Sequence, residues 1–152
     1  MQYVMELTTA FLGTLGFALL FRVRRERLLP ACLGGILAWG VYLLMGTRVD
    51  SDMICCFVSA VVLTIYAEVM ARVVKCPATL FIIVAVIPLV PGGALYGTMY
   101  HFVKGDFAVS SQLGVSTLLQ AVAIAAGMLF PTSLFQLLRR SREIRRQERM
   151  AG

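Results

Sequence analysis

Long apolar segments follow one another along the chain, separated by short clusters of charged or turn-forming residues. A segment of about 20 apolar residues is long enough to cross the hydrocarbon core of a membrane as a helix. The pattern therefore predicts an all-α integral membrane protein with about five transmembrane helices. Strands of a membrane barrel would instead alternate apolar and polar residues over short segments. The predicted spans are residues 3–21, 29–46, 53–71, 78–103 and 112–138.

The fourth predicted span is interrupted near its centre by the stretch from Pro88 to Gly93, a Pro-x-x-Pro-Gly-Gly motif. Each proline lacks an N–H and crowds the carbonyl four residues earlier, which frees the carbonyls of Val84 and Ile87. An unbroken helix over 78–103 would also be roughly 39 Å long, against about 30 Å for the hydrocarbon core. We therefore expect a helix broken at mid-membrane. Its freed backbone groups need partners inside the protein or in a watery cavity.

Basic residues divide unequally between the two sides that five spans create. Of the 14 basic residues, only Arg48 and Lys104 fall on one side. The other side receives Arg22, Arg24, Arg25, Arg27, Arg72, Lys75, Arg139, Arg140, Arg142, Arg145, Arg146 and Arg149. The positive-inside rule then predicts an outside N-terminus and a cytoplasmic C-terminus. Residues 1–138 would form the membrane domain, and 139–152 a basic cytoplasmic tail.

The composition excludes several other classes of protein. Hydrophobic residues make up 59% of the chain and charged residues 14%, with a mean hydropathy of +0.84. The net charge of +6 follows from membrane topology and does not indicate a nucleic-acid partner. The four cysteines have neither metal-ligand nor disulfide-framework spacing. No catalytic triad or phosphate loop is present, so the sequence predicts no enzyme, no cofactor and no metal.

A helix broken inside the membrane is a recurring feature of secondary transporters, which bind solutes at such breaks. The second half-helix would begin near Gly92, and the positive end of its dipole would suit a carboxylate. The candidate substrate-binding residues are Pro88, Pro91, Gly92, Gly93, Tyr96, Tyr100 and Gln120. Two alternatives stay open at this point. The prolines could only shape the bundle, and Tyr100 could belong with His101 to an interfacial aromatic belt.

Two titratable residues are candidates for proton coupling. His101 is the single histidine, and an unperturbed histidine titrates near neutral pH. Glu68 is an acid within the third span, and intramembrane acids can relay protons. Glu68 also precedes Arg72 by four residues, the favourable order for an ion pair on a helix, so pairing is its main alternative role.

The stretch from Ile87 to Tyr96 resembles the signature of the threonine/serine exporter family, together with the later Thr98-Met99-Tyr100 and Lys104-Gly105-Asp106. The run Ala123-Ile124-Ala125-Ala126-Gly127 is similar to a patch in that family's following helix. The resemblance implies a small C-terminal-type subunit of the split, two-component form. Its location would be the bacterial inner membrane, with the lipid bilayer around it.

This resemblance also implies a function and a partner. Relatives export threonine and serine or a dicarboxylate such as succinate, by secondary transport expected to be coupled to protons as an antiporter. The partner would be a larger membrane subunit of the same family, and a homo-oligomer is the other assembly to consider. An alternative reading is a non-transporting scaffold that stabilises the larger subunit.

Overall fold

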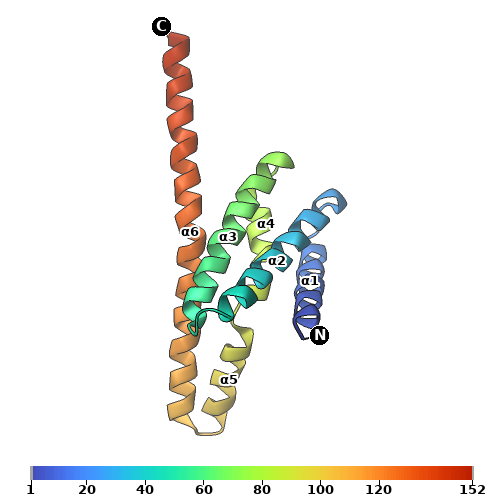
Figure 1. Cartoon of the computed structure of the whole chain (residues 1–152), viewed down its shortest axis with the longest axis vertical. Coiled ribbons are helices and arrows are strands. Elements are labelled where there is room, and N and C mark those ends of the chain that lie inside the picture. The colour runs from blue at the N-terminus through green and yellow to red at the C-terminus, as the bar shows by residue number, and fades with distance from the viewer. Residues whose placement is uncertain (1, 152) are drawn as a thin grey trace.

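The computed structural model describes the backbone of residues 2–151 and the side chains of residues 3–137. Its elements are the helices α1 (Gln2–Leu20), α2 (Arg25–Gly46), α3 (Asp52–Val73), α4 (Ala78–Ala85), α5 (Gly92–Val103) and α6 (Phe107–Ala151), with a short 3₁₀ helix η1 (Ile87–Leu89) after α4 (Figure 1). Among these residues, 4 helices are long and apolar enough to cross a membrane singly. The pair Ala78–Leu89 and Gly92–Val103 passes the same test as one unit bent by 50°. The predicted all-α membrane fold with a broken fourth span is confirmed.

Short turns that carry charged residues separate the helices. Arg22 follows α1 and Lys75 follows α3, both with left-handed φ values of 53° and 52°. Gly105 has a φ of 84° between α5 and α6, where a residue without a Cβ has no steric penalty. The charged side chains of Arg22 and Lys75 favour turns at the water-exposed ends of the helices.

Small residues let neighbouring helices approach closely, as expected for helix packing in lipid. Gly35 of α2 lies directly against the side chain of Thr14 in α1. Gly127 of α6 lies against α3, where an added Cβ would be only 2.6 Å from the carbonyl oxygen of Phe57. At Gly13, by contrast, an added Cβ would meet nothing within 4 Å. Only some of the small residues in the sequence therefore serve packing within this chain.

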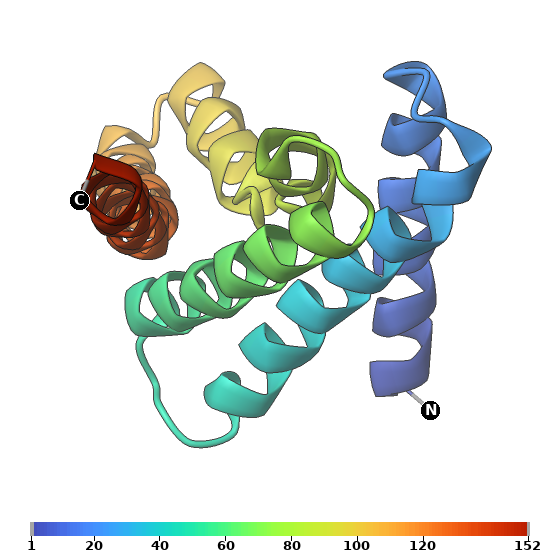
Figure 2. The same cartoon turned by 90° about the horizontal axis from the view of Figure 1, so that it is seen from above.

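The helices form a bundle with a hairpin that extends beyond it. In Figure 2 α1 lies at one edge and α6 at the opposite edge, with α2 and α3 between them. In Figure 1 α5 and the first part of α6 continue past the end of the bundle as a pair of adjacent helices. Ser110 ties this pair together by donating a 2.8 Å hydrogen bond to the carbonyl of Thr98. No residue of α5 is buried.

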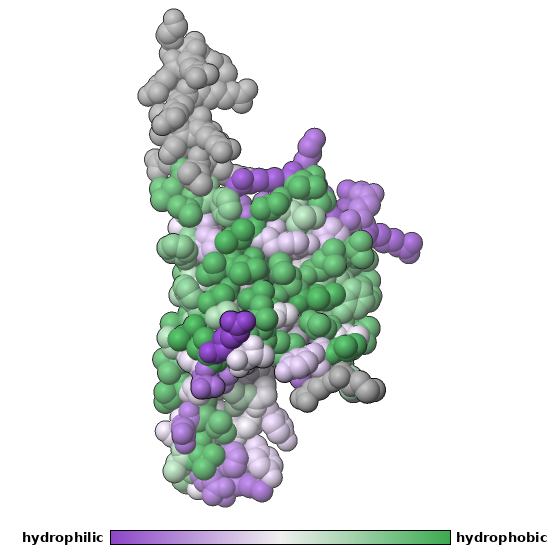
Figure 3. Space-filling view, in the orientation of Figure 1, coloured by the Kyte–Doolittle hydropathy of each residue, from purple (hydrophilic) through white to green (hydrophobic). Residues whose placement is uncertain are grey.

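The direction of α5 determines where the break lies. In Figure 1 the break is level with the turn between α2 and α3 and the start of α1, near one end of the bundle. The break lies near this end because α5 leads away from α2 and α3 and packs on α6 instead. The depth of the break in the membrane stays a prediction. Figure 3 shows an apolar band across the visible face of the bundle, with hydrophilic residues above it and at the tip of the hairpin.

The proposed tail is continuous with the last span. Helix α6 extends without interruption to Ala151 and so includes residues 139–151. The side chains of that segment lie outside the described residues, so the division at residue 138 and the cytoplasmic location of the tail stay predictions.

Candidate functional site

A cavity of about 250 Å³ lies at the break. Its walls come from segments far apart in the sequence, namely α2, α3, the break with the first residues of α5, and α6. The lining residues are Trp39, Tyr42, Asp52, Cys56, Pro88, Leu89, Val90, Pro91, Gly92, Gly93, Ala94 and Gln120. The cavity thus places the irregular backbone of the fourth span beside side chains from three other helices.

Local hydrogen bonds satisfy most, but not all, of the backbone at the break. The carbonyl of Ile87 accepts from the N–H of Val90 at 3.1 Å, so it is not left free as the sequence suggested. The N–H of Leu95 donates to the carbonyl of Pro91 at 3.0 Å and starts the regular bonding of α5. Among the described residues, the N–H groups of Gly93 and Ala94 have no acceptor. The first turn of α5 therefore has unused donors, and both residues line the cavity.

The two glycines at the start of α5 are not explained by backbone geometry. Gly92 and Gly93 are helical, and neither has a positive φ. A Cβ added at either residue would meet nothing within 4 Å, so packing within the chain does not require glycine either. Because both residues line the cavity, their effect is to keep the positive end of α5 free of side chains.

An acidic group lies on a different wall of the same cavity. Asp52 is the first residue of α3, and its Oδ1 accepts a 3.2 Å hydrogen bond from the hydroxyl of Tyr42. The carboxylate retains further lone pairs, since an ionised carboxylate can accept several hydrogen bonds. The cavity therefore has a helix N-terminus suited to a negative group and a carboxylate suited to a positive one.

Two further lining residues have spare hydrogen-bonding capacity. Trp39 stacks on Tyr42 with ring centroids 5.0 Å apart, and its Nε1 is buried without a partner in the part of the chain that the structure describes. Gln120 is 9% exposed, and its Nε2 lies 3.5 Å from the hydroxyl of Ser116, the outer limit of a hydrogen bond. Buried polar groups are normally satisfied, so these groups are free to bind a solute or water in the cavity.

The structure brings together most, but not all, of the residues that the sequence singled out for substrate binding. Those that line the cavity are Pro88, Pro91, Gly92, Gly93 and Gln120. Tyr96 and Tyr100 do not line it; they stack on each other at 6.1 Å and are 71% and 43% exposed. A role in substrate binding stays a prediction for all seven residues.

The two candidates for proton coupling lie away from the break cavity. The Nδ1 of His101 is 3.5 Å from a carboxylate oxygen of Asp106, at the tip of the α5–α6 hairpin. Glu68 lies at the other end of the bundle, with one carboxylate oxygen 3.8 Å from the guanidinium of Arg72. The expected pairing of Glu68 with Arg72 is therefore present. Proton coupling stays a prediction for both residues.

Seven of the lining residues were not among the candidates from the sequence. Leu89, Val90 and Ala94 adjoin the candidates at the break, whereas Trp39, Tyr42, Asp52 and Cys56 come from other helices. In the sequence, Asp52 is an acidic residue four positions after Arg48, between two predicted spans. The usable signal is that Asp52 opens the third span on the same side of the membrane as the end of the second span. Trp39 is the single tryptophan and lies within a span, which gave no indication of a binding role.

Comparison with known proteins identifies the family. Residues 6–134 match the family described as Threonine/Serine exporter, ThrE. The chain belongs to the threonine/serine exporter family. No curated protein and no solved structure matches it. The matched range includes every residue that lines the break cavity, so this cavity belongs to a domain of a transporter family.

Proposed function

We propose that this chain is a subunit of a secondary exporter of threonine or serine, and that the solute binds in the break cavity. One observation carries the proposal: the open N-terminus of α5 and the carboxylate of Asp52 line the same cavity. A zwitterionic amino acid has a carboxylate for the first and an ammonium group for the second. The Nε1 of Trp39 and the amide of Gln120 offer further donors for the carboxylate or the hydroxyl group.

The same features favour an amino acid over a dicarboxylate such as succinate. A second carboxylate would approach Asp52, and like charges within a few ångströms strongly disfavour each other's ionised forms. The volume of about 250 Å³ lies just below the usual range for drug-sized ligands, roughly 300 Å³ and above. A solute of the size of threonine or serine therefore suits this cavity.

We expect the working exporter to contain a second membrane subunit. Membership of this family supports pairing with a larger partner, and α5 supports it independently because none of its residues is buried. The stacked pair Tyr96 and Tyr100 lies on this uncovered helix, where a partner would bring the two rings next to the solute pathway. The outward orientation of the N-terminus rests on the distribution of basic residues along the chain. Proton antiport rests on membership of the family.

The competing function is a scaffold that stabilises a larger, self-sufficient transporter subunit. In that case the break would be an interface, and changes to the lining residues would affect assembly without changing solute affinity. Efflux by the larger subunit alone would then equal efflux by the pair.

The decisive experiment reconstitutes this chain alone, the larger subunit alone and the two together in proteoliposomes. We expect saturable transport of labelled threonine and serine by the pair, with little competition from succinate. Asp52→Asn should weaken transport, whereas Asp50→Asn in the adjoining turn serves as the matched control. Equal transport by the larger subunit alone would support the scaffold instead. Strong competition by succinate would overturn the amino-acid assignment.

A further inference from the structure

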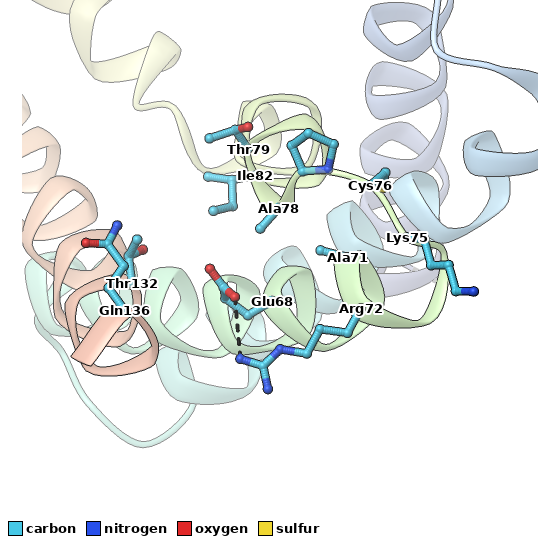
Figure 4. A pocket seen from close by; sticks show the side chains of 11 residues that line it. Glu68, Ala71, Arg72, Lys75, Cys76, Ala78, Thr79, Ile82, Thr132 and Gln136 are labelled. Carbon is cyan, nitrogen blue, oxygen red and sulfur yellow. Dashed lines mark ion pairs between the residues drawn. The ribbon is translucent and has the colours of Figure 1, made fainter. Parts of the chain in front are cut away.

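A second cavity, larger than the first, opens at the other end of the bundle between α3, α4 and α6 (Figure 4). Its volume is about 640 Å³. The lining residues are Glu68, Ala71, Arg72, Lys75, Cys76, Pro77, Ala78, Thr79, Ile82, Thr132 and Gln136. This basic-end cleft adjoins the start of α4, whereas the break cavity lies beyond the end of that helix. Positive-inside topology makes it the cytoplasmic mouth of the bundle.

Glu68 is the one carboxylate among the residues that line the basic-end cleft. In Figure 4 its side chain points from α3 toward α4, and it is only 12% exposed. The distance of 3.8 Å to the Arg72 guanidinium exceeds hydrogen-bond length. A buried charge is costly unless it is paired and hydrogen-bonded, so this carboxylate is an acceptor for an incoming cation.

Arg72 is held at the rim of the cleft and does not neutralise Glu68 fully. Its guanidinium lies over the ring of Phe135 in α6 at 4.8 Å from the ring centroid, a cation–π contact. Its side chain is 41% exposed, and Lys75 is exposed as well. In Figure 4 the side chain of Arg72 runs back beside Glu68, whereas that of Lys75 extends away from it toward the outside. The cleft therefore has a negative interior and a positive rim.

Neutral polar groups complete the cleft. Thr79 comes from α4, and Thr132 and Gln136 come from α6. The hydroxyl of Thr132 donates a 2.6 Å hydrogen bond to the carbonyl of Met128, which leaves its oxygen able to accept. These groups offer both donors and acceptors for a solute that carries a hydroxyl group.

We propose that the basic-end cleft is a second solute site, which binds the ammonium group of a zwitterionic amino acid on Glu68. The carboxylate of the amino acid then faces the rim formed by Arg72 and Lys75. This inference rests on the proposed export function, for which the cleft is the loading site on the cytoplasmic side. A dicarboxylate does not suit it, since one of its charges would approach Glu68.

The two sites are separate in this structure. The side chains of Leu63, Phe81 and Val84 in α3 and α4 are at most 1% exposed and fill the space between the helices. Helix α4 spans only about 12 Å along its axis. The two sites therefore lie at opposite ends of this short helix.

A native cysteine allows a direct test. Cys76 lines the basic-end cleft and is partly exposed, whereas Cys32, Cys55 and Cys56 are at most 2% exposed. A hydrophilic maleimide applied to the full-length chain, purified with its larger subunit, should label Cys76 first. Mass spectrometry of the peptide containing this residue measures the labelling rate. We expect threonine to slow labelling and succinate not to slow it.

Variants then assign the effect to Glu68. Glu68→Gln should raise the threonine concentration that gives half-protection at least about tenfold, since a charge-assisted hydrogen bond contributes roughly 1.5–3 kcal/mol. Glu68→Asp, which keeps the charge, should restore part of the protection. The labelling rate without solute should be similar in all three proteins. Failure of threonine to protect Cys76, or equal protection in Glu68→Gln, would overturn the second site.

The break cavity provides the control that separates the two proposals. Asp52→Asn should reduce efflux and keep the protection of Cys76, because Asp52 does not line the basic-end cleft. Loss of efflux in Asp52→Asn without any protection in the unmodified protein would leave the export function standing and refute the loading site. Protection of Cys76 in a pair that transports neither threonine nor serine would support binding and refute export.

Discussion

Tyr42 and Asp52 are joined by a hydrogen bond of 3.2 Å that links the last turns of α2 to the first residue of α3. The phenol donates, and the carboxylate oxygen accepts. This bond fixes a negative group on the wall of the break cavity, which also contains the open first turn of α5. The arrangement gives the cavity two ends of opposite polarity, and the predictions about transport follow from it.

Replacing Asp52 by asparagine should weaken threonine binding. Asn keeps the shape of the side chain and loses its charge, so the interaction with the ammonium group becomes a neutral hydrogen bond. We expect the KM for threonine to rise about 10- to 100-fold, corresponding to roughly 1.5–3 kcal/mol. Uptake by proteoliposomes measures this value. Asp50→Asn, in the adjoining turn, should leave it unchanged, and an unchanged KM in Asp52→Asn would rule out the proposed pairing.

Replacing Tyr42 by phenylalanine should have a smaller effect in the same direction. The variant keeps the ring that stacks on Trp39 at 5.0 Å and loses only the hydroxyl that orients Asp52. A net hydrogen bond contributes about 0.5–1.5 kcal/mol, so the KM should rise roughly two- to tenfold. Combining Tyr42→Phe with Asp52→Asn should add little further effect if the phenol acts through the carboxylate. Full additivity of the two effects would contradict this positioning role.

Side chains added to the open turn of α5 should abolish efflux. Gly92→Leu introduces a side chain where nothing lies within 4 Å of the Cβ, so the chain should still insert and fold. Pro91→Ala should also abolish efflux, because proline fixes the backbone just before α5. Gly46→Leu is the matched control, since its Cβ would also meet nothing within 4 Å and it does not line the cavity. Efflux by vesicles, with protein amount measured by immunoblot, tests all three. Normal efflux in both Gly92→Leu and Pro91→Ala would reject the role of the break.

The sequence allowed the break itself to be predicted because proline and glycine act locally, through a missing N–H and a missing Cβ. It did not allow the direction of α5 to be predicted, since length and hydropathy determine whether a segment can span but not where it leads after a 50° bend. The shared face of Tyr96 and Tyr100 was likewise predictable from helical spacing. That this face points away from the cavity depends on the packing of α5 against α6. The sequence places Asp52 at the start of the third span, but its entry into the cavity depends on the fold of the turn before it.

Close packing of α6 on α3 should make Gly127 intolerant of even a methyl group. An added Cβ would be 2.6 Å from the carbonyl oxygen of Phe57 and 2.8 Å from the Cβ of Ala60, so the helices would have to separate. Overpacking of this kind costs about 1–3 kcal/mol. We expect Gly127→Ala to lower the melting temperature of the purified protein in detergent, together with its transport activity.

The matched control for this substitution is Gly13→Ala in α1, where an added Cβ would meet nothing within 4 Å. Alanine is the better helix former by about 1 kcal/mol, so this variant should be as stable as the unmodified protein or more so. A lower melting temperature for Gly127→Ala, together with an unchanged or higher one for Gly13→Ala, would establish that α3 and α6 are held by direct backbone approach at Gly127. A melting temperature for Gly127→Ala equal to that of Gly13→Ala would mean that the two helices separate without cost.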